Sequence, residues 1–249
     1  MARRLPRLVT TTDIRGDLHC HTRATDGHHS LEQMARAAMQ RGYEYLAVTD
    51  HSQHVRVANG LDERQLARQL AAIDRVNEQL DGLVLLKGCE VDILSDGRLD
   101  LPDSILKQLD LAVGAIHYGF GLSRQHQTER ILRAMDNPNL SILAHPTGRL
   151  LNEREPYEID LERVLSGARD RGVFVEVNAH PYRLDLNGDA CRLAGELGAT
   201  LAISTDAHSV TDLDFMVYGV EQARRGWLEK ADVLNTRSLN QVIKLLARS

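Results

Sequence analysis

The chain has 249 residues, of which 43% are hydrophobic and 26% charged, and its formal net charge is −5 at pH 7. No stretch approaches the ~20 consecutive apolar residues of a transmembrane helix, and the negative charge argues against tight binding of duplex DNA, which needs a basic face. The charged N-terminus, Met1-Ala2-Arg3-Arg4, has no apolar segment behind it, so we expect no signal peptide, no membrane partner and a cytoplasmic protein.

Short apolar runs alternate along the chain with segments of helical periodicity. They predict strands at 16–19, 45–49, 83–86, 111–113, 141–143, 173–177 and 200–203. They predict helices at 31–39, 66–80, 102–109, 126–136, 160–171, 189–197, 212–225 and 238–247. Such alternation is typical of a parallel sheet with right-handed crossovers. We therefore expect an α/β fold with one domain over 1–249, either a distorted barrel of seven units or an open, doubly wound sheet.

Potential metal ligands lie at seven places, each where an apolar run ends: residues 17–21, 49–51, 88–90, 115–117, 143–145, 176–178 and 204–208. The carboxyl ends of parallel strands converge on one rim of a barrel. Imidazoles and carboxylates gathered without lysines are typical of a metal site. In a doubly wound sheet, ligands bind at the one point where the strand order reverses. These residues instead follow all the strands, which favours the barrel.

Two i, i+2 pairs stand near the ends of the chain. His19 and His21 share one face of the first strand, since side chains alternate, and Cys20 between them points away. Asp206 and His208 repeat this spacing after the last strand, which neighbours the first if a barrel closes. The same alternation separates Cys89 from Glu90, so we interpret both thiols as core residues.

Single polar residues complete the candidate site. His51, His117 and His145 each end an apolar run, and Glu90 is placed at a strand end, where it suits a bridging ligand between two ions. Asp26, in Thr25-Asp26-Gly27, is equally well explained as a turn residue.

Three further residues are candidates for the rim of the cavity. His180 is expected to face it. Arg149 and Arg183 are either solvated loop arginines or a bidentate clamp on a phosphate. The chain lacks the motifs G-x-S-x-G, G-x-x-x-x-G-K-[ST] and G-x-G-x-x-G after a strand, which leaves metal-assisted hydrolysis as the favoured chemistry.

At these residues the chain resembles the PHP (polymerase and histidinol phosphatase) family, whose pattern is an HxH strand, a TDH strand, a Glu strand, two single-His strands and a terminal DxH strand. The resemblance is closest to the C-terminal PHP domain of bacterial family X DNA polymerases. It rests on Gly16-Asp17-Leu18-His19, Val57-Ala58-Asn59-Gly60-Leu61, Leu99-Asp100-Leu101-Pro102, His145-Pro146-Thr147-Gly148-Arg149, Arg183-Leu184-Asp185-Leu186 and Ala223-Arg224-Arg225-Gly226-Trp227-Leu228.

The resemblance implies a distorted (β/α)7 barrel, a trinuclear metal centre and phosphoester hydrolysis, including 3′-to-5′ exonuclease activity in the polymerase relatives. Carried over by motif, it implies nine metal ligands: His19, His21, Asp26, His51, Glu90, His117, His145, Asp206 and His208. It thereby makes Asp26 a ligand, which spacing alone left open. The polymerase and helix-hairpin-helix parts of those relatives are absent from this sequence.

We expect two to three divalent ions, of zinc, manganese or iron. One would be held by His19, His21, Glu90 and Asp206; a second by Glu90, His117 and His145; and a third by Asp26, His51 and His208. Glu90, Asp206 and His208 are the expected catalytic residues, and Arg149, Arg183 and His180 the expected phosphate-binding residues.

Two substrates remain open at this point: a nucleic-acid 3′ end and a small phosphate monoester of the histidinol-phosphatase type. A non-catalytic domain that supports a DNA polymerase is the alternative of another class.

Overall fold

The computed structural model describes residues 5–247, so the predictions that concern residues 1–4 and 248–249 lie outside the described residues. Seven strands form one sheet: β1 (Gly16–Cys20), β2 (Tyr45–Val48), β3 (Val84–Asp92), β4 (Leu111–Ala115), β5 (Leu140–Leu143), β6 (Phe174–Asn178) and β7 (Leu201–Ser204). The helices that alternate with them are α1 (Leu31–Gln40), α2 (Glu63–Asn77), α3 (Asp103–Leu106), α4 (Arg124–Met135), α5 (Leu161–Arg171), α6 (Gly188–Leu197), α7 (Met216–Arg225) and α8 (Leu239–Leu246). These positions agree with the predicted elements, except that β3 extends to Asp92 where a strand over 83–86 was predicted.

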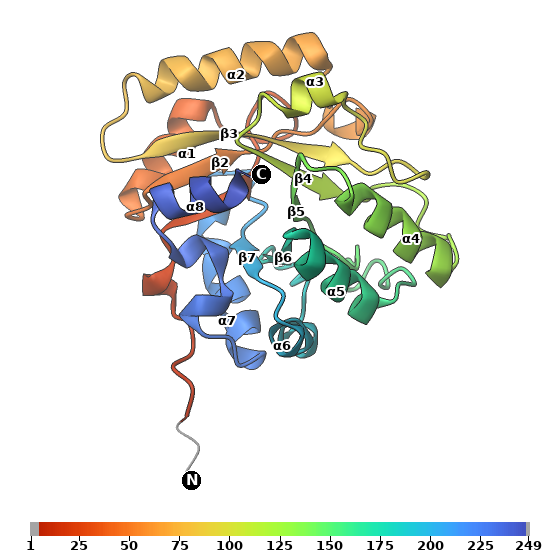
Figure 1. Cartoon of the computed structure of the whole chain (residues 1–249). Helices are drawn as coiled ribbons and strands as arrows, with labels where there is room; N and C mark the ends of the chain where they lie inside the picture. The colour runs from red at the N-terminus through yellow and green to blue at the C-terminus, as the bar shows by residue number, and fades with distance from the viewer. Residues whose placement is uncertain (1–4, 248–249) are drawn as a thin grey trace.

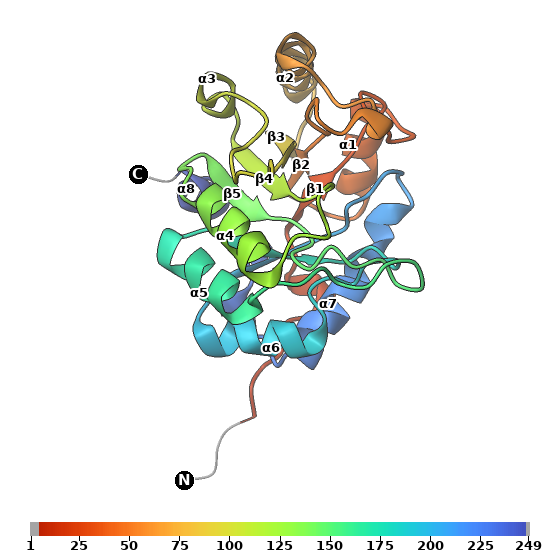
Figure 2. The same cartoon turned by 90° about the vertical axis from the view of Figure 1, so that its right-hand side faces the viewer.

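The strands follow one another around the sheet in chain order, and every paired neighbour is parallel. Two views at right angles show the helices packed outside the strands (Figures 1 and 2). The first and last strands approach each other beyond their C-terminal ends, where the His21 N–H donates to the carbonyl of Ala207 (2.8 Å) and the Asp206 N–H to that of His19 (3.0 Å). The fold is therefore the predicted distorted (β/α)7 barrel, nearly closed.

Asn235 bridges the remaining gap between β1 and β7. Its side-chain amide donates to the carbonyls of Gly16 and Ile203, both at 2.8 Å, and its Oδ1 accepts from the Ile203 N–H at 3.0 Å. The side chain is fully buried. Asn235 thus supplies hydrogen bonds to two strand edges that would otherwise be buried without partners.

An apolar cluster fills the N-terminal end of the barrel. It contains Tyr45, Leu111 and Phe174, each the first residue of its strand, together with Val242 and Leu246 of α8. A second cluster lies between the strands and the surrounding helices. Because α8 and these side chains fill one end, the polar residues can gather only at the opposite, C-terminal end.

An irregularity in β1 directs the HxH pair into the barrel. Asp17 and Cys20 pair with Leu46 and Val48, so β1 contains one more residue than β2 between these points. Leu18 belongs to the inner cluster and Cys20 to the outer one. A bulge of this kind re-aims side chains, and here it lets the inward-facing set pass from Leu18 to His19 and His21.

Glu90 does not stand at a strand end, contrary to the prediction. Strand β3 continues two residues further, to Asp92. Cys89 and Val91 belong to the outer apolar cluster, so Glu90 and Asp92 face the inside of the barrel. Among residues 5–247, no helix is both long and apolar enough to cross a membrane.

Replacement of Asn235 by Ala is expected to destabilise the barrel, because it leaves three buried backbone groups of β1 and β7 without partners. At 1–3 kcal/mol for each unsatisfied group, with partial relaxation, the free energy of unfolding should fall by about 3 kcal/mol. Urea denaturation measures this. Asn240→Ala, at an exposed position of α8, is the control and should change the value by less than about 0.5 kcal/mol; an equal effect of both variants would contradict the bridging role.

Candidate metal centre

The structure brings all nine predicted metal ligands together. Eight of them form three overlapping groups, and within each group the ligand atoms lie within 4.8 Å of one another. The groups are His21, Asp26, His51 and His208; His19, His21 and Asp206; and His51, Glu90 and His117. The ninth, His145, has its Nε2 3.0 Å from the Oε1 of Glu90.

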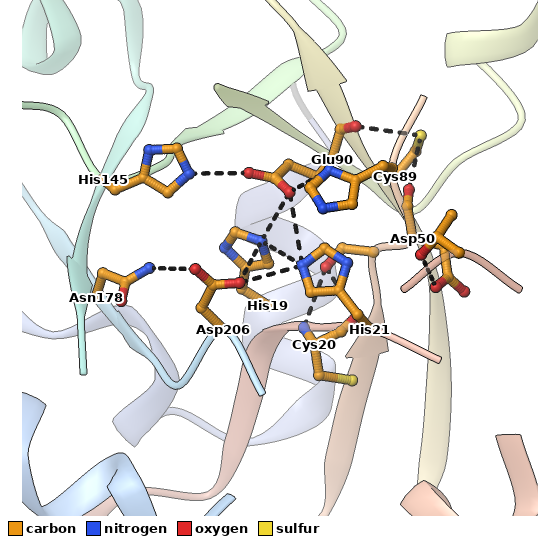
Figure 3. A network of polar contacts seen from close by, with 12 residues as sticks. His19, Cys20, His21, Asp50, Cys89, Glu90, His145, Asn178 and Asp206 are labelled. Atoms are coloured by element: carbon orange, nitrogen blue, oxygen red, sulfur yellow. Dashed lines mark hydrogen bonds and ion pairs between the residues drawn. The ribbon is translucent and has the colours of Figure 1, made fainter. Parts of the chain in front are cut away.

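Glu90 lies at the centre of this arrangement (Figure 3). Its side chain is 1% exposed. Imidazole nitrogens of five residues lie 2.9–3.5 Å from its oxygens: His19, His21, His51, His117 and His145. Burial acts to raise the pKa of Glu90, but the surrounding imidazoles outweigh it and hold this pKa well below its usual range. Glu90 is therefore an ionised carboxylate in the barrel interior.

Two more carboxylates contact the same imidazoles from the other side. The Oδ1 of Asp206 lies 3.2 Å from the Nε2 of His21. The Oδ2 of Asp26, in the loop after β1, lies 3.5 Å from the Nε2 of His51 and 3.4 Å from the Nε2 of His208. The loop carrying Asp26 thus folds back over the strand ends, although its sequence is equally compatible with a simple turn.

The observed groups differ from the expected sets of ligands: Glu90 is not in the group of His19, His21 and Asp206, His21 also joins the group of Asp26, and His145 lies outside all three groups. His51 joins Glu90 and His117, in addition to Asp26 and His208. The reason is strand order: the segment after β2 forms a bridge with β3 at His51 and Glu90, which places these two residues side by side. His145 reaches Glu90 from across the barrel instead.

Three of the imidazoles are oriented by hydrogen bonds on their outer nitrogens. The Nδ1 of His19 contacts Glu176 at 2.7 Å, that of His117 contacts Asp92 at 2.9 Å, and that of His208 contacts the carbonyl of Asp206 at 2.8 Å. Each ring therefore directs its Nε2 towards the centre. Outer-nitrogen contacts to carboxylates or carbonyls are characteristic of histidines that ligate metals.

Glu176 lies in one of the seven segments with potential metal ligands, but neither it nor Asp92 was among the nine predicted ligands, although both are fully buried and polar. The second oxygen of Glu176 also accepts from the backbone N–H of His145 at 2.7 Å and from the Asn178 amide at 3.1 Å. A signal was present: Glu176 and Asn178 end a strand with the same i, i+2 spacing as His19 and His21, and Asp92 stands two residues after Glu90.

Several buried polar atoms at the centre have no hydrogen-bond partner. They are the Nδ1 atoms of His21 and His145 and the Oδ1 of Asp26; the Nδ1 of His51 and the Oε2 of Glu90 also make no hydrogen bond, although they lie 2.9 Å apart as an ion pair. Buried polar groups are ordinarily satisfied. Buried imidazole nitrogens and carboxylate oxygens that lie close together without full hydrogen bonding fit divalent metal ions such as zinc or manganese.

Burial and charge act in opposite directions on the imidazole pKa values. Burial, reinforced by neighbouring positive groups, lowers the pKa of His21 to about 3 and that of His145 to about 4. Burial also acts to lower the pKa of His51, but Glu90 and Asp26 outweigh it and raise this pKa to about 10. Neutral imidazole is the form that ligates metal, while the carboxylates attract positive charge to the same space.

Two of the predicted ligands have backbone conformations that non-glycine residues rarely adopt. The φ angles are 26° at His145 and 54° at Asp206. Such angles cost of order 1–3 kcal/mol and persist only where the surrounding contacts enforce them. Both residues follow the last residues of strands β5 and β7, where the chain turns its side chains back over the barrel.

The thiols lie outside the centre, as the alternation of side chains predicts. The Sγ of Cys20 contacts the carbonyl of Ala47 at 3.1 Å, and that of Cys89 contacts the carbonyl of Asp50 at 3.3 Å. Both residues are fully buried in the outer apolar cluster, and Figure 3 shows the Cys20 sulfur directed away from the imidazoles.

The two arginines occupy different positions. The Nε of Arg183 lies 3.3 Å from the Oδ2 of Asp206, and its Nη1 is buried without a partner. Arg149 instead donates through Nε to the carbonyl of Arg183 at 2.7 Å and through a second nitrogen to the carbonyl of Leu184. The structure thus places Arg183 beside the centre, whereas Arg149 supports the loop that carries it.

His180 lies on the same loop, partly exposed at the rim. Its backbone N–H donates to the Oδ1 of Asn178 at 3.0 Å. Burial lowers its pKa, so the ring is neutral near pH 7.

If the nine residues bind divalent ions, Zn²⁺ or Mn²⁺ should stabilise the folded protein by about 2.7 kcal/mol when the free ion is at 100 times its Kd. Glu90→Gln keeps the side-chain size but removes the negative charge that imidazoles of five residues surround, so most of this stabilisation should disappear. Thermal denaturation with and without the ion measures it. Glu78→Gln, at an exposed position after α2, is the control; a response of Glu90→Gln equal to that of the unmodified protein would show that the ions bind elsewhere.

Comparisons with known proteins agree with this architecture. The family model described as the PHP domain matches residues 17–180. The DNA polymerase/3′-5′ exonuclease PolX of Bacillus subtilis (strain 168) is 43% identical over 242 residues. The match covers 97% of this chain and 42% of that relative, so the chain spans less than half of its length.

Other relatives match over most of their length. A probable phosphatase of Thermoanaerobacter sp. (strain X514) is 29% identical over 232 residues, which are 88% of this chain and 89% of the relative. One similar solved structure is the histidinol phosphate phosphatase of Lactococcus lactis, complexed with zinc, L-histidinol and phosphate. It superposes on this chain with a TM-score of 0.59 and is 14% identical in sequence. The match covers 84% of this chain and 93% of that protein. That likeness concerns the fold alone. The family match confirms the predicted resemblance: the chain belongs to the PHP family of phosphoester hydrolases.

Proposed function

We propose that the protein removes nucleotides from the 3′ ends of single-stranded nucleic acid by hydrolysis of the terminal phosphodiester, with divalent ions as cofactors. The proposal rests chiefly on one observation: nine imidazoles and carboxylates converge beside a buried guanidinium nitrogen of Arg183 that has no partner. The similarity to a relative named as a 3′-5′ exonuclease, over nearly the whole chain, supports it.

The three groups of side chains would hold two to three ions. His19, His21 and Asp206 form one group; Glu90, His51 and His117 a second, with His145 adjoining; and Asp26, His51, His208 and His21 a third. Ions held there would supply an activated water and neutralise negative charge on the phosphate. Within this proposal Glu90, Asp206 and His208 are the catalytic residues: Glu90 also contacts His19 and His21 of the neighbouring group, Asp206 adjoins Arg183, and His208 lies on the more exposed side.

Arg183 is the residue proposed to bind the substrate phosphate. Its Nε is paired with Asp206, which holds the guanidinium at the edge of the centre, and its buried Nη1 has no hydrogen-bond partner. A guanidinium donates to phosphate oxygens with favourable geometry and strength. Arg149 acts through Arg183: its hydrogen bonds to residues 183 and 184 fix the loop.

The β5–α5 and β6–α6 loops are joined in both directions. The carboxylate of Asp185 accepts from the backbone N–H groups of Thr147 (2.9 Å) and Gly148 (3.0 Å), and Arg149 donates back to the loop that contains Asp185. This mutual support fixes the loop that holds Arg183 next to Asp206.

A small phosphate monoester is the alternative substrate. Several relatives named as probable phosphatases match this chain at 26–30% identity over most of their own length, as the one from Thermoanaerobacter does. A non-catalytic role beside a polymerase is less well supported, because a purely structural barrel does not need nine converging ligands with oriented imidazoles.

A direct comparison of substrates tests the proposal. With Mn²⁺ or Zn²⁺ supplied, the protein should shorten a single-stranded oligonucleotide from its 3′ end and should act poorly on a panel of small phosphate monoesters. Because the proposed contact is one guanidinium on one phosphate and the chain carries a net charge of −5, the rate at subsaturating oligonucleotide should fall only shallowly with added salt. Rapid hydrolysis of one monoester with no shortening of the oligonucleotide at low salt would overturn the proposal in favour of the phosphatase.

The same assay examines the phosphate-binding residue. Arg183→Ala should lower kcat/KM on the oligonucleotide by about 100-fold, the effect of removing one donor to a charged transition state. Arg36→Ala, at an exposed position of α1, is the control and should leave kcat/KM unchanged. Unchanged activity of Arg183→Ala would exclude this guanidinium from substrate binding.

A further inference from the structure

Aromatic rings gather at one side of the metal centre. The chain contains only 3 Phe, 6 Tyr and 1 Trp, yet Tyr182, Phe215 and Tyr218 lie together with His180 on the loop after β6 and at the start of α7. We refer to these four residues as the rim aromatic patch. The ring centroids of His180 and Tyr182 are 5.5 Å apart, those of His180 and Phe215 are 5.3 Å apart, and those of Phe215 and Tyr218 are 6.1 Å apart.

The rim aromatic patch is connected to the centre through short links. Asn178 accepts from the His180 N–H and donates to the Oδ2 of Asp206, both at 3.0 Å. His180 and Arg183 belong to one turn, closed by the hydrogen bond from the Arg183 N–H to the His180 carbonyl at 2.8 Å. The turn therefore presents a guanidinium to the metal centre and aromatic rings to the space just outside it.

The outer rings of the patch are open to solvent. Tyr182 is 62% exposed and Tyr218 is 47% exposed, while His180 and Phe215 between them are partly buried. The aromatic–aromatic contacts hold these rings in place. Contiguous exposed apolar surface beside a site is a mark of ligand binding, whereas single exposed side chains are ordinary.

Nearby acidic side chains are already engaged. The carboxylate of Asp212 accepts from the His208 N–H at 3.0 Å, and Asp214 is paired with Arg41 at 2.8 Å. Of these two carboxylates only that of Asp214 is paired with a positive charge, while Arg183 supplies a positive charge on the side of the metal centre.

We propose that the rim aromatic patch stacks the bases of the nucleotides at the 3′ end of a single-stranded nucleic acid while the terminal phosphodiester enters the metal centre. This inference rests on the proposed exonuclease function and assigns the residues that hold the bases of its single-stranded substrate. Every base has a flat π face, so aromatic side chains bind single strands with little sequence preference. In a duplex those faces are covered by stacking and pairing, and access to them requires unpairing.

The patch also accounts for how an acidic protein can hold its substrate. Electrostatic contacts with many phosphates are not available to a chain of net charge −5. Stacking on Tyr182 and Tyr218 does not depend on net charge. The substrate is then held by its bases and by one phosphate, rather than along its backbone.

An oligonucleotide with missing bases separates stacking from phosphate chemistry. The test compares a single-stranded oligodeoxynucleotide with one of the same length whose last three nucleotides are abasic, at equal Mn²⁺. Both present the same phosphodiesters and charge. The unmodified protein should act on the base-bearing strand with a kcat/KM roughly 5- to 100-fold higher, the range expected when one or more bases stack.

Variants of the patch should remove this preference. Tyr182→Leu combined with Tyr218→Leu keeps apolar bulk but removes both rings, so the ratio of the two kcat/KM values should approach one while hydrolysis of the abasic strand is retained. Tyr182→Phe combined with Tyr218→Phe should keep the preference. Trp227→Ala, an exposed aromatic (56%) beyond the far end of α7, is the matched control and should also keep it.

The outcomes distinguish the inference from the function on which it rests. Equal hydrolysis of both strands by the unmodified protein would overturn base stacking and leave the exonuclease proposal standing. A preserved preference in the double Leu variant would show that the bases bind elsewhere. Hydrolysis of neither strand, with activity on a small monoester, would overturn both proposals.

Discussion

The buried carboxylate of Glu90 imposes the main constraint on this structure. An isolated ionised carboxylate in a protein interior costs several kcal/mol unless positive charge and hydrogen bonds compensate. Here imidazoles of five residues surround it within 3.5 Å, and they come from β1 and from segments that follow β1, β2, β4 and β5. Glu90 can be surrounded in this way only if the strands close into a barrel whose C-terminal ends meet, so the fold and the charge of the centre depend on each other.

A second set of residues fixes the geometry of the first. Glu176 orients His19 and holds the backbone of His145, while Asp92 orients His117. The positive φ angles at His145 and Asp206 are maintained by these contacts and by the amide of Asn178 on Asp206. The apolar end of the barrel, filled by α8, provides the rigid support. Preorganisation of this kind allows ligands and phosphate-binding groups to act without rearrangement.

The sequence was sufficient to predict the strands, helices and strand-end ligands, because buried parallel strands are short apolar runs and their polar successors share one rim. The sequence was insufficient to predict features that depend on contacts between segments far apart in the chain. Glu90 looked like a strand end because Glu and Asp are uncommon inside strands, yet β3 continues to Asp92 with both carboxylates facing inward. Spacing could not show that the Asp26 loop folds back, nor that Arg149 supports the backbone that presents Arg183. The patch of Tyr182 and Tyr218 joins segments about 35 residues apart, and periodicity within one local window does not predict such a contact.

The central claim is that the nine converging side chains are a binding site for divalent ions. Crystals grown with Zn²⁺ and measured on both sides of the zinc absorption edge test it most directly. The account predicts two or three anomalous peaks among these side chains, about 2.0–2.2 Å from imidazole nitrogens and from oxygens of Glu90 and Asp206. Crystals at saturating Zn²⁺ with no peak inside the barrel mouth, and with the imidazoles still hydrogen-bonded to the carboxylates, would contradict it.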